Sequence, residues 1–157
     1  MTQVRSIHHF IDGQHKAGTS GRVSDVFDPA TGEVQAQVDL ASVDEVNEAV
    51  KSASKAAIAW RESSLTQRTQ IMFKFRELLA DRTTELAKVI SSEHGKVVSD
   101  AAGEVARGLE NVEFACGIAN HLKGSINEQV SDGIEVYSLR QTLGAVAGIT
   151  PFNFPAM

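Results

Sequence analysis

The feature that most constrains the fold is a continuous run of small apolar residues near the C-terminus, Leu143–Ile149. A run without alternating polar residues predicts a strand covered on both faces, as in a parallel sheet. One such strand cannot form a parallel sheet, and only residues 150–157 follow it. A buried strand without neighbours is a conflict between local and global structure that complete domains avoid. We therefore expect these residues to be the N-terminal part of a larger α/β protein.

Length and composition do not reveal this, because 157 residues with 42% hydrophobic side chains suit one ordinary domain. A net charge of −5 argues against nucleic acid as a partner. The N-terminal residues do not have the pattern of a signal or transit peptide, and no apolar run approaches the roughly 18 residues of a membrane span. We therefore expect a cytoplasmic protein with no membrane partner.

The segments on either side of the chain's middle predict short strands. In the first 40 residues, apolar segments are separated by the turn sequences Asp12-Gly13 and Asp28–Gly32, which predicts two hairpins, or a hairpin and an edge strand. Period-two alternation on both sides of Ser131–Gly133 predicts another hairpin over residues 126–139.

Between these strands, apolar residues recur with the 3.6-residue period of amphipathic helices. Two of the expected helices begin with capping-box sequences, in which a serine precedes Glu or Gln by three residues. The predicted helices run from Ser42 for about five turns, from Ser64 to Gly95, and from Ser99 or Asp100 to Gly124.

The loop after the apolar run holds the strongest candidate for chemistry, Asn153. Ligands of open α/β sheets bind in loops at the carboxyl ends of parallel strands. Pro151 and Pro155 frame this loop, and Phe152 and Phe154 can exclude water from Asn153. Its amide NH₂ could then donate to developing negative charge. The alternative is that Asn153 only satisfies local backbone groups in a turn.

The segment Gly148–Met157 resembles the strand and loop of the aldehyde dehydrogenase superfamily, whose usual form is Pro-Trp-Asn-Phe-Pro. Thr142 and Ala145 depart from the family's usual Pro and Val, at positions that affect packing more than chemistry. The resemblance covers the chain from Phe10 onward. Further motifs are similar to the CoA-acylating methylmalonate-semialdehyde dehydrogenase branch: Phe152 in place of Trp, Glu93–Lys96, Gly103–Glu110, Glu113–Cys116 and Lys123-Gly124.

The resemblance implies the N-terminal part of the aldehyde dehydrogenase fold, which is an α/β fold. Residues 1–124 would form the N-terminal arm and three helices of the NAD-binding domain. Residues 125–141 would form an oligomerisation hairpin, and residues 142–157 the first strand and loop of a Rossmann-like parallel sheet. The family's nucleophilic cysteine, general-base glutamate and most of its NAD site would lie beyond residue 157. The full-length protein is then expected to be a homotetramer.

The resemblance also implies an activity, the NAD-dependent oxidative decarboxylation of methylmalonate or malonate semialdehyde with CoA to propionyl-CoA or acetyl-CoA. Asn153 would hold the oxyanion that forms when the enzyme thiolate adds to the aldehyde. Ile149, Thr150, Pro151 and Phe152 would lie along NAD. The 157 residues alone are expected to be inactive. A hydrolytic NAD(P)-dependent aldehyde dehydrogenase and a non-catalytic assembly or binding module remain as alternatives.

Arg107 is the candidate for binding the carboxylate of such a semialdehyde, because a planar guanidinium is its natural bidentate partner. It lies out of phase with the apolar stripe of its predicted helix, and Gly108 leaves room beside it. The alternative is an ordinary helix-surface arginine paired with Glu104 or Glu110.

The remaining candidates favour structural roles. Cys116, the single cysteine, cannot form an internal disulfide and lies on an apolar stripe, so we interpret it as a buried hydrophobe and not as a nucleophile. His8, His9 and His15 have no cysteine or carboxylate cluster at ligand spacing, so we expect no metal site.

Overall fold

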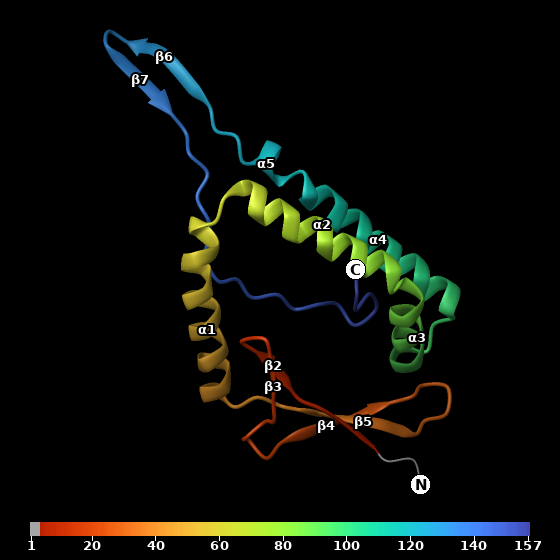
Figure 1. Ribbon diagram of the computed structural model, residues 1–157. Coiled ribbons are helices and arrows are strands. Elements are labelled where there is room, and N and C mark those ends of the chain that lie inside the picture. Colours follow the sequence, from red (N-terminus) through yellow and green to blue (C-terminus); the bar gives the residue numbers. More distant parts are fainter. Residues whose placement is uncertain (1–3) are drawn as a thin grey trace.

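The computed structural model describes residues 4–157, which form two small N-terminal sheets, a layer of helices and a projecting hairpin (Figure 1). The helices lie between the N-terminal strands and the hairpin, and the C-terminal segment runs back alongside them (Figure 1). No helix within residues 4–157 is long and apolar enough to cross a bilayer.

The N-terminal strands form one antiparallel hairpin and one three-stranded sheet. The hairpin turns at Asp12 and Gly13, which both have left-handed backbone with φ of 56° and 73°. The sheet has the order β1-β5-β4, in which β1 is parallel and β4 antiparallel to β5. The predicted pair of hairpins is confirmed, and the parallel β1 is an addition. The strands are β1 (Arg5–Ile7), β2 (His9–Ile11), β3 (Gln14–Lys16), β4 (Val23–Phe27) and β5 (Val34–Asp39).

The first two helices start where the capping boxes predict. Helix α1 (Val43–Glu62) follows Ser42, whose side chain accepts the N–H of Glu45 while the Glu45 carboxylate accepts the N–H of Ser42. Helix α2 (Leu65–Asp81) is capped in the same way by Ser64 and Gln67. These reciprocal bonds satisfy backbone donors that the first turn of a helix leaves without partners.

The predicted single helix from Ser64 to Gly95 is wrong, because α2 ends at Asp81 and α3 (Thr83–His94) follows after Arg82. Arg82 has φ −103° and ψ 12°, away from helical values. The Thr83 hydroxyl donates to carbonyls of the preceding turn, and such bonds bend helices. Gly95 ends α3 in the left-handed conformation with φ 86°, as predicted.

The third predicted helix also differs at both ends. Helix α4 (Val98–Cys116) starts after Val97 without a side-chain cap, so the expected capping role of Ser99 or Asp100 is wrong. Instead, the Val97 carbonyl accepts the N–H groups of Asp100 and Ala101. The helix ends before Gly117, and only the short α5 (Ile118–His121) continues toward Gly124.

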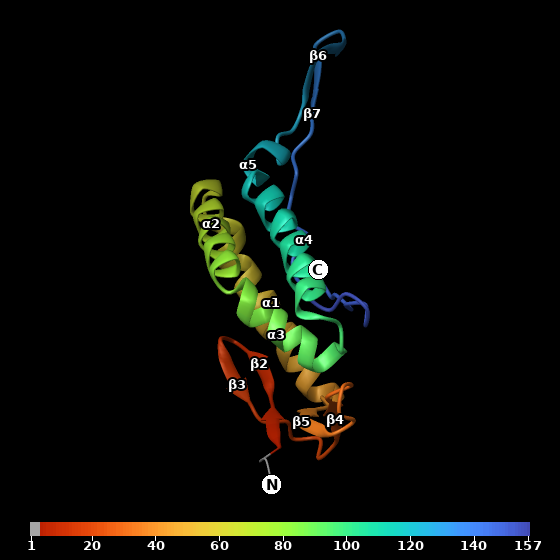
Figure 2. The same ribbon diagram turned by 90° about the vertical axis from the view of Figure 1, so that its right-hand side faces the viewer.

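The core lies between α3 and α4. Its buried residues are Ala87 and Ile90 of α3 and Ala101 and Val105 of α4, and both alanines are fully buried. Small side chains at the contact allow the two helices to approach closely. Helix α2 lies alongside α4, as Figure 2 shows.

The predicted hairpin over residues 126–139 is confirmed by β6 (Ile126–Ser131) and β7 (Ile134–Tyr137), which pair antiparallel. This hairpin projects away from the helices, and all its strand residues are exposed (Figure 1).

The apolar run Leu143–Ile149 forms no hydrogen-bonded strand in this structure. Leu143 is 91% and Ile149 fully exposed. A parallel strand requires neighbours, and the strands described in residues 4–137 pair among themselves. Only the composition of the run therefore indicates a buried strand.

Candidate functional site

The loop that contains Asn153 is attached to α4 through a buried carboxylate. Glu104 is 2% exposed, and its Oε1 accepts the backbone N–H of Ala156 at 2.7 Å. Its other oxygen, Oε2, accepts from the Lys96 ammonium at 2.5 Å. Burial raises the pKa of Glu104, but these two hydrogen bonds outweigh it and hold the pKa below its usual value. Glu104 is therefore a charged anchor for the loop.

Lys96 is the second anchor of this loop. Its Nζ donates to the backbone carbonyl of Asn153 at 3.1 Å and lies 4.9 Å from the centroid of the Phe154 ring. A cation at this distance over an aromatic face is attracted by the ring quadrupole. Together, Lys96 and Glu104 contact the loop at three residues, Asn153, Phe154 and Ala156.

Gly108 lets this loop lie directly on α4. The glycine is buried, and a Cβ added to it would lie 3.0 Å from the backbone oxygen of Ala156. Any other residue at this position would therefore push the loop outward. Glycine at position 108 thus allows the close contact with the loop, besides leaving room for Arg107.

Arg107 and Asn153 line the same hollow, which has a volume of about 410 Å³. Arg107 is exposed on α4, and no carboxylate within residues 4–157 forms an ion pair with it. Glu104, one of its possible partners, pairs with Lys96. The Asn153 side-chain amide likewise forms no hydrogen bond within the described chain, so its NH₂ donors are available to a ligand. The hollow is completed by Lys96, Ser99, Asp100, Gly103, Glu104 and Phe154.

The four residues expected along NAD lie outside this hollow. Ile149, Thr150, Pro151 and Phe152 are exposed, with Ile149 fully and Phe152 90% accessible. Their backbone and apolar side chains are therefore open to a flat ligand.

Sequence reasoning missed the anchoring roles of Lys96 and Glu104. A signal was present, because Glu104 shares the buried helical face of Ala101, Val105 and Gly108. A carboxylate in a buried phase requires a charged or hydrogen-bonding partner.

Two other candidates lie elsewhere. Cys116 is 8% exposed at the end of α4, which confirms its interpretation as a buried residue. His8 forms a hydrogen bond with Asp39 at 2.8 Å, and His9 lies 3.7 Å from Glu45. No group of three or more His, Cys, Asp or Glu side chains in residues 4–157 is arranged to hold a metal ion.

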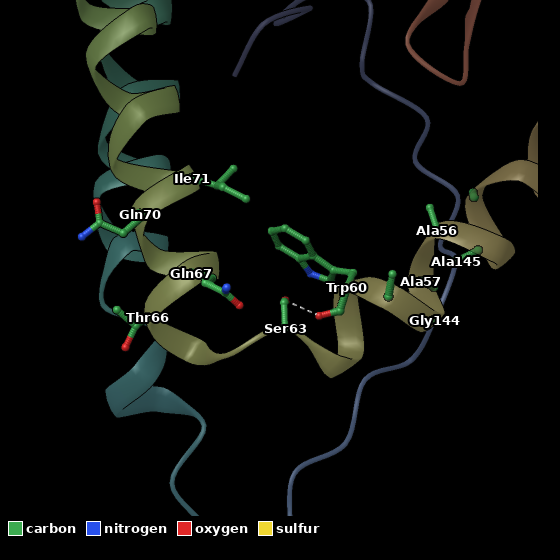
Figure 3. A pocket seen from close by; sticks show the side chains of 12 residues that line it. Ala56, Ala57, Trp60, Ser63, Thr66, Gln67, Gln70, Ile71, Gly144 and Ala145 are labelled. Atoms are coloured by element: carbon green, nitrogen blue, oxygen red, sulfur yellow. Dashed lines mark hydrogen bonds between the residues drawn. The ribbon is translucent and has the colours of Figure 1, made fainter.

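A larger apolar hollow of about 1020 Å³ lies between α1 and α2, where the C-terminal segment passes at Gly144-Ala145 (Figure 3). Figure 3 shows Trp60 and Ile71 directed into the space between the two helices. Alanines of α1 form much of its wall, and no acidic or basic side chain lines it. This hollow is mainly apolar and holds no acidic or basic side chain for proton transfer.

The order of hairpins, helices and projecting hairpin, with an asparagine loop bonded to α4, is a mixed α/β arrangement. Comparison with known proteins specifies the class further. The chain belongs to the aldehyde dehydrogenase family, whose sequence profile matches residues 15–157.

Its relatives include malonate-semialdehyde dehydrogenases. The chain is 45% identical over 152 residues to malonate-semialdehyde dehydrogenase of Pseudomonas aeruginosa. The matched residues make up 97% of this chain and 30% of the relative. It is 45% identical over all 157 residues to malonate-semialdehyde dehydrogenase 2 of Geobacillus thermodenitrificans, of which it covers 32%. The chain thus spans about a third of the length of these relatives.

Two crystal structures share the fold closely. One is a protein of Sinorhizobium meliloti 1021 assigned as a methylmalonate-semialdehyde dehydrogenase and complexed with NAD, with a TM-score of 0.96 and 48% identity. It covers 100% of this chain, which covers 32% of it. The other is methylmalonate-semialdehyde dehydrogenase of Oceanimonas doudoroffii, with a TM-score of 0.93 and 45% identity. The match covers 98% of this chain and 31% of that protein's chain.

Proposed function

We propose that these residues are the N-terminal part of an NAD-dependent, CoA-acylating malonate- or methylmalonate-semialdehyde dehydrogenase. The observation that carries the proposal is the shared hollow of Arg107 and Asn153. It combines a cation without an ion pair and an amide donor without a partner, which suit the two ends of a carboxylated aldehyde. The similarity to relatives named for this substrate class supports the same assignment.

In this proposal, Asn153 acts on the aldehyde. Its amide NH₂ donates to the oxygen that becomes negatively charged when a thiolate from another part of the enzyme adds to the carbonyl carbon. The backbone that carries the donor is held by Lys96 before the reaction, which reduces the reorganisation required as charge develops. Residues 149–152 would contact NAD through backbone and apolar side chains, and the bound NAD would supply the acceptor for the hydride.

Arg107 acts on the opposite end of the substrate. Its guanidinium forms paired hydrogen bonds with the carboxylate and thereby orients the aldehyde toward Asn153. We propose that replacing Arg107 by Leu in the full-length protein penalises malonate semialdehyde far more than propanal. Arg61→Leu, an exposed substitution at the end of α1, serves as the control. Equal effects of Arg107→Leu on both aldehydes would contradict the assignment.

The products separate this proposal from the hydrolytic alternative. The purified full-length protein, supplied with malonate semialdehyde, NAD and CoA, should yield acetyl-CoA with loss of carbon dioxide. Formation of the free acid in the presence of CoA would favour the hydrolytic alternative. The 157 residues alone should not reduce NAD, because the nucleophile and general base are expected outside them.

The proposed location rests on the pattern of the N-terminal residues, and the proposed oligomeric state rests on the same resemblance. We expect the full-length protein in the cytoplasm as a homotetramer in which the β6–β7 hairpin contributes to oligomerisation. Analytical ultracentrifugation of the full-length protein tests the tetramer. A monomer at micromolar concentration would contradict it.

A further inference from the structure

The geometry points to Lys96 and Glu104 as positioning residues that hold Asn153 in its reactive orientation. Lys96 fixes the Asn153 carbonyl and Glu104 fixes the Ala156 N–H, so the loop is held at the backbone of Asn153 and again three residues after it. Neither residue is assigned a bond to substrate. The catalytic consequence rests on the proposed function, whereas the attachment of the loop does not.

The burial of the pair makes it an effective anchor. The Lys96 side chain is 13% and that of Glu104 1% exposed, so solvent screens their interaction little. By contrast, the Lys74–Glu77 pair of α2 has side-chain exposures of 67% and 59%, which is typical of pairs that contribute little. The two pairs therefore provide a matched comparison within one chain.

The chain has few other contacts that could hold this loop. Within residues 4–157, the loop's own backbone contributes one long bond, from the Phe154 N–H to the Pro151 carbonyl at 3.4 Å. Asn153 itself is exposed. The position of the backbone that carries its amide consequently depends on the bonds that Lys96 and Glu104 supply.

The pair also separates two cationic roles in the hollow. Lys96 and Arg107 both line it, yet only Lys96 is neutralised by a carboxylate. Arg107 is therefore the cation of the hollow that remains for an anionic ligand, and Asp100 on the same wall forms no ion pair with it among the described residues. We therefore expect changes at the pair to alter the rate for every aldehyde, and changes at Arg107 to alter the choice among aldehydes.

The first test measures amide hydrogen exchange in the chain itself. Lys96→Met alone would leave a buried carboxylate unpaired and could unfold α4, so the variant is the double Lys96→Met and Glu104→Leu. Buried ion pairs replaced by apolar residues often keep the fold. We expect exchange at Ala156 to become at least about tenfold faster, while Ile90 in the core is unchanged. A change below threefold at Ala156 would overturn the proposal.

The second test measures kinetics of the full-length protein with propanal, which lacks a carboxylate. A loss of positioning should lower kcat at least about tenfold and leave KM for propanal within about twofold. Lys96→Arg, which retains the charge, should lose less than the double variant. Lys74→Met should change neither constant. An unchanged kcat, or a loss confined to KM, would overturn the proposal.

The two tests fail separately. If the full-length protein does not oxidise semialdehydes, the proposed function is wrong, and amide exchange still decides whether the pair holds the loop. If semialdehydes are oxidised and exchange at Ala156 does not change, the function stands and the positioning role is wrong.

Discussion

The α3–α4 pair and the run Leu143–Ile149 are both rich in small apolar residues, yet they end in opposite environments. Ala87, Ala101 and Val105 are at most 1% exposed, whereas Leu143 and Ile149 are 91% and 100% exposed. The helices find their partner after a short turn, because α3 and α4 are consecutive in the chain. A parallel strand must find neighbours that other crossover units supply.

The difference arises because the helices and the run need different numbers of partners to be covered. Helices satisfy their own backbone hydrogen bonds and require only one apolar face to be covered. The run at 143–149 requires both backbone and side-chain partners. We expect its partners to come from the two thirds of the relatives' length that these residues do not cover, which rests on the proposed function.

The largest effect is expected from an acidic substitution in the core. Val105→Asp places a carboxylate at a position that is 1% exposed and should destabilise the α3–α4 pair by at least about 3 kcal/mol. The matched Val146→Asp, at 79% exposure, should change stability by less than about 0.5 kcal/mol. Urea unfolding followed by circular dichroism measures both. Equal losses of stability in the two variants would contradict the difference in burial between the two regions.

Next in size is the cap of α1. Ser42→Ala removes the side-chain acceptor for the Glu45 N–H and should cost about 1 kcal/mol. Ser64→Ala should cost a similar amount at α2, because its capping box has the same bonds. Thermal unfolding measures both losses. A loss near zero at either position would show that tertiary contacts, and not local caps, determine where these helices start.

Two glycines of α4 differ in the space beside them, and this difference can be tested by substitution. A Cβ at Gly103 meets nothing within 4 Å, so Gly103→Ala should stabilise the helix by about 0.8 kcal/mol. At Gly108 the same Cβ would lie 3.0 Å from the Ala156 oxygen, so Gly108→Ala should stabilise less and displace the loop. Denaturant unfolding measures stability, and amide exchange at Ala156 measures the displacement. Equal stabilisation without faster exchange would contradict the close contact.

The last prediction about stability concerns acid and involves no substitution. Hydrogen bonds from the backbone N–H groups of Ser42 and Thr19 lower the pKa of Glu45 to about 2. A depressed pKa means that the folded state favours the charged carboxylate. Its contribution to stability is therefore complete above the ordinary glutamate pKa of 4.5 and is lost as pH falls toward 2. NMR titration of Glu45 should give a midpoint near 2, and one near 4.5 would contradict these bonds.

The elements that the sequence predicted correctly are governed by local contacts. The caps at Ser42 and Ser64, the turn at Asp12-Gly13 and the end of α3 at Gly95 each depend on residues within one turn. The break at Arg82 was missed because the apolar period continues through it.

The candidate site was predictable only in part. Asn153 and Arg107 were identified by their chemistry and by resemblance. Their presence in one hollow depends on the tertiary structure, which the sequence pattern does not show. The anchoring roles of Lys96 and Glu104 depend on a contact between α4 and a loop about fifty residues later. A buried charge in a helical stripe is visible in the sequence, whereas its partner is not.

The substitution Asn153→Ala in the full-length protein tests most directly the proposed role of Asn153 as a donor to the oxyanion. If Asn153 donates to the oxyanion, kcat should fall about a hundredfold or more, and equally with malonate semialdehyde and propanal. Asn120→Ala, an exposed asparagine of α5, is the control and should leave kcat unchanged. A loss of less than threefold, or one confined to malonate semialdehyde, would contradict the role of Asn153.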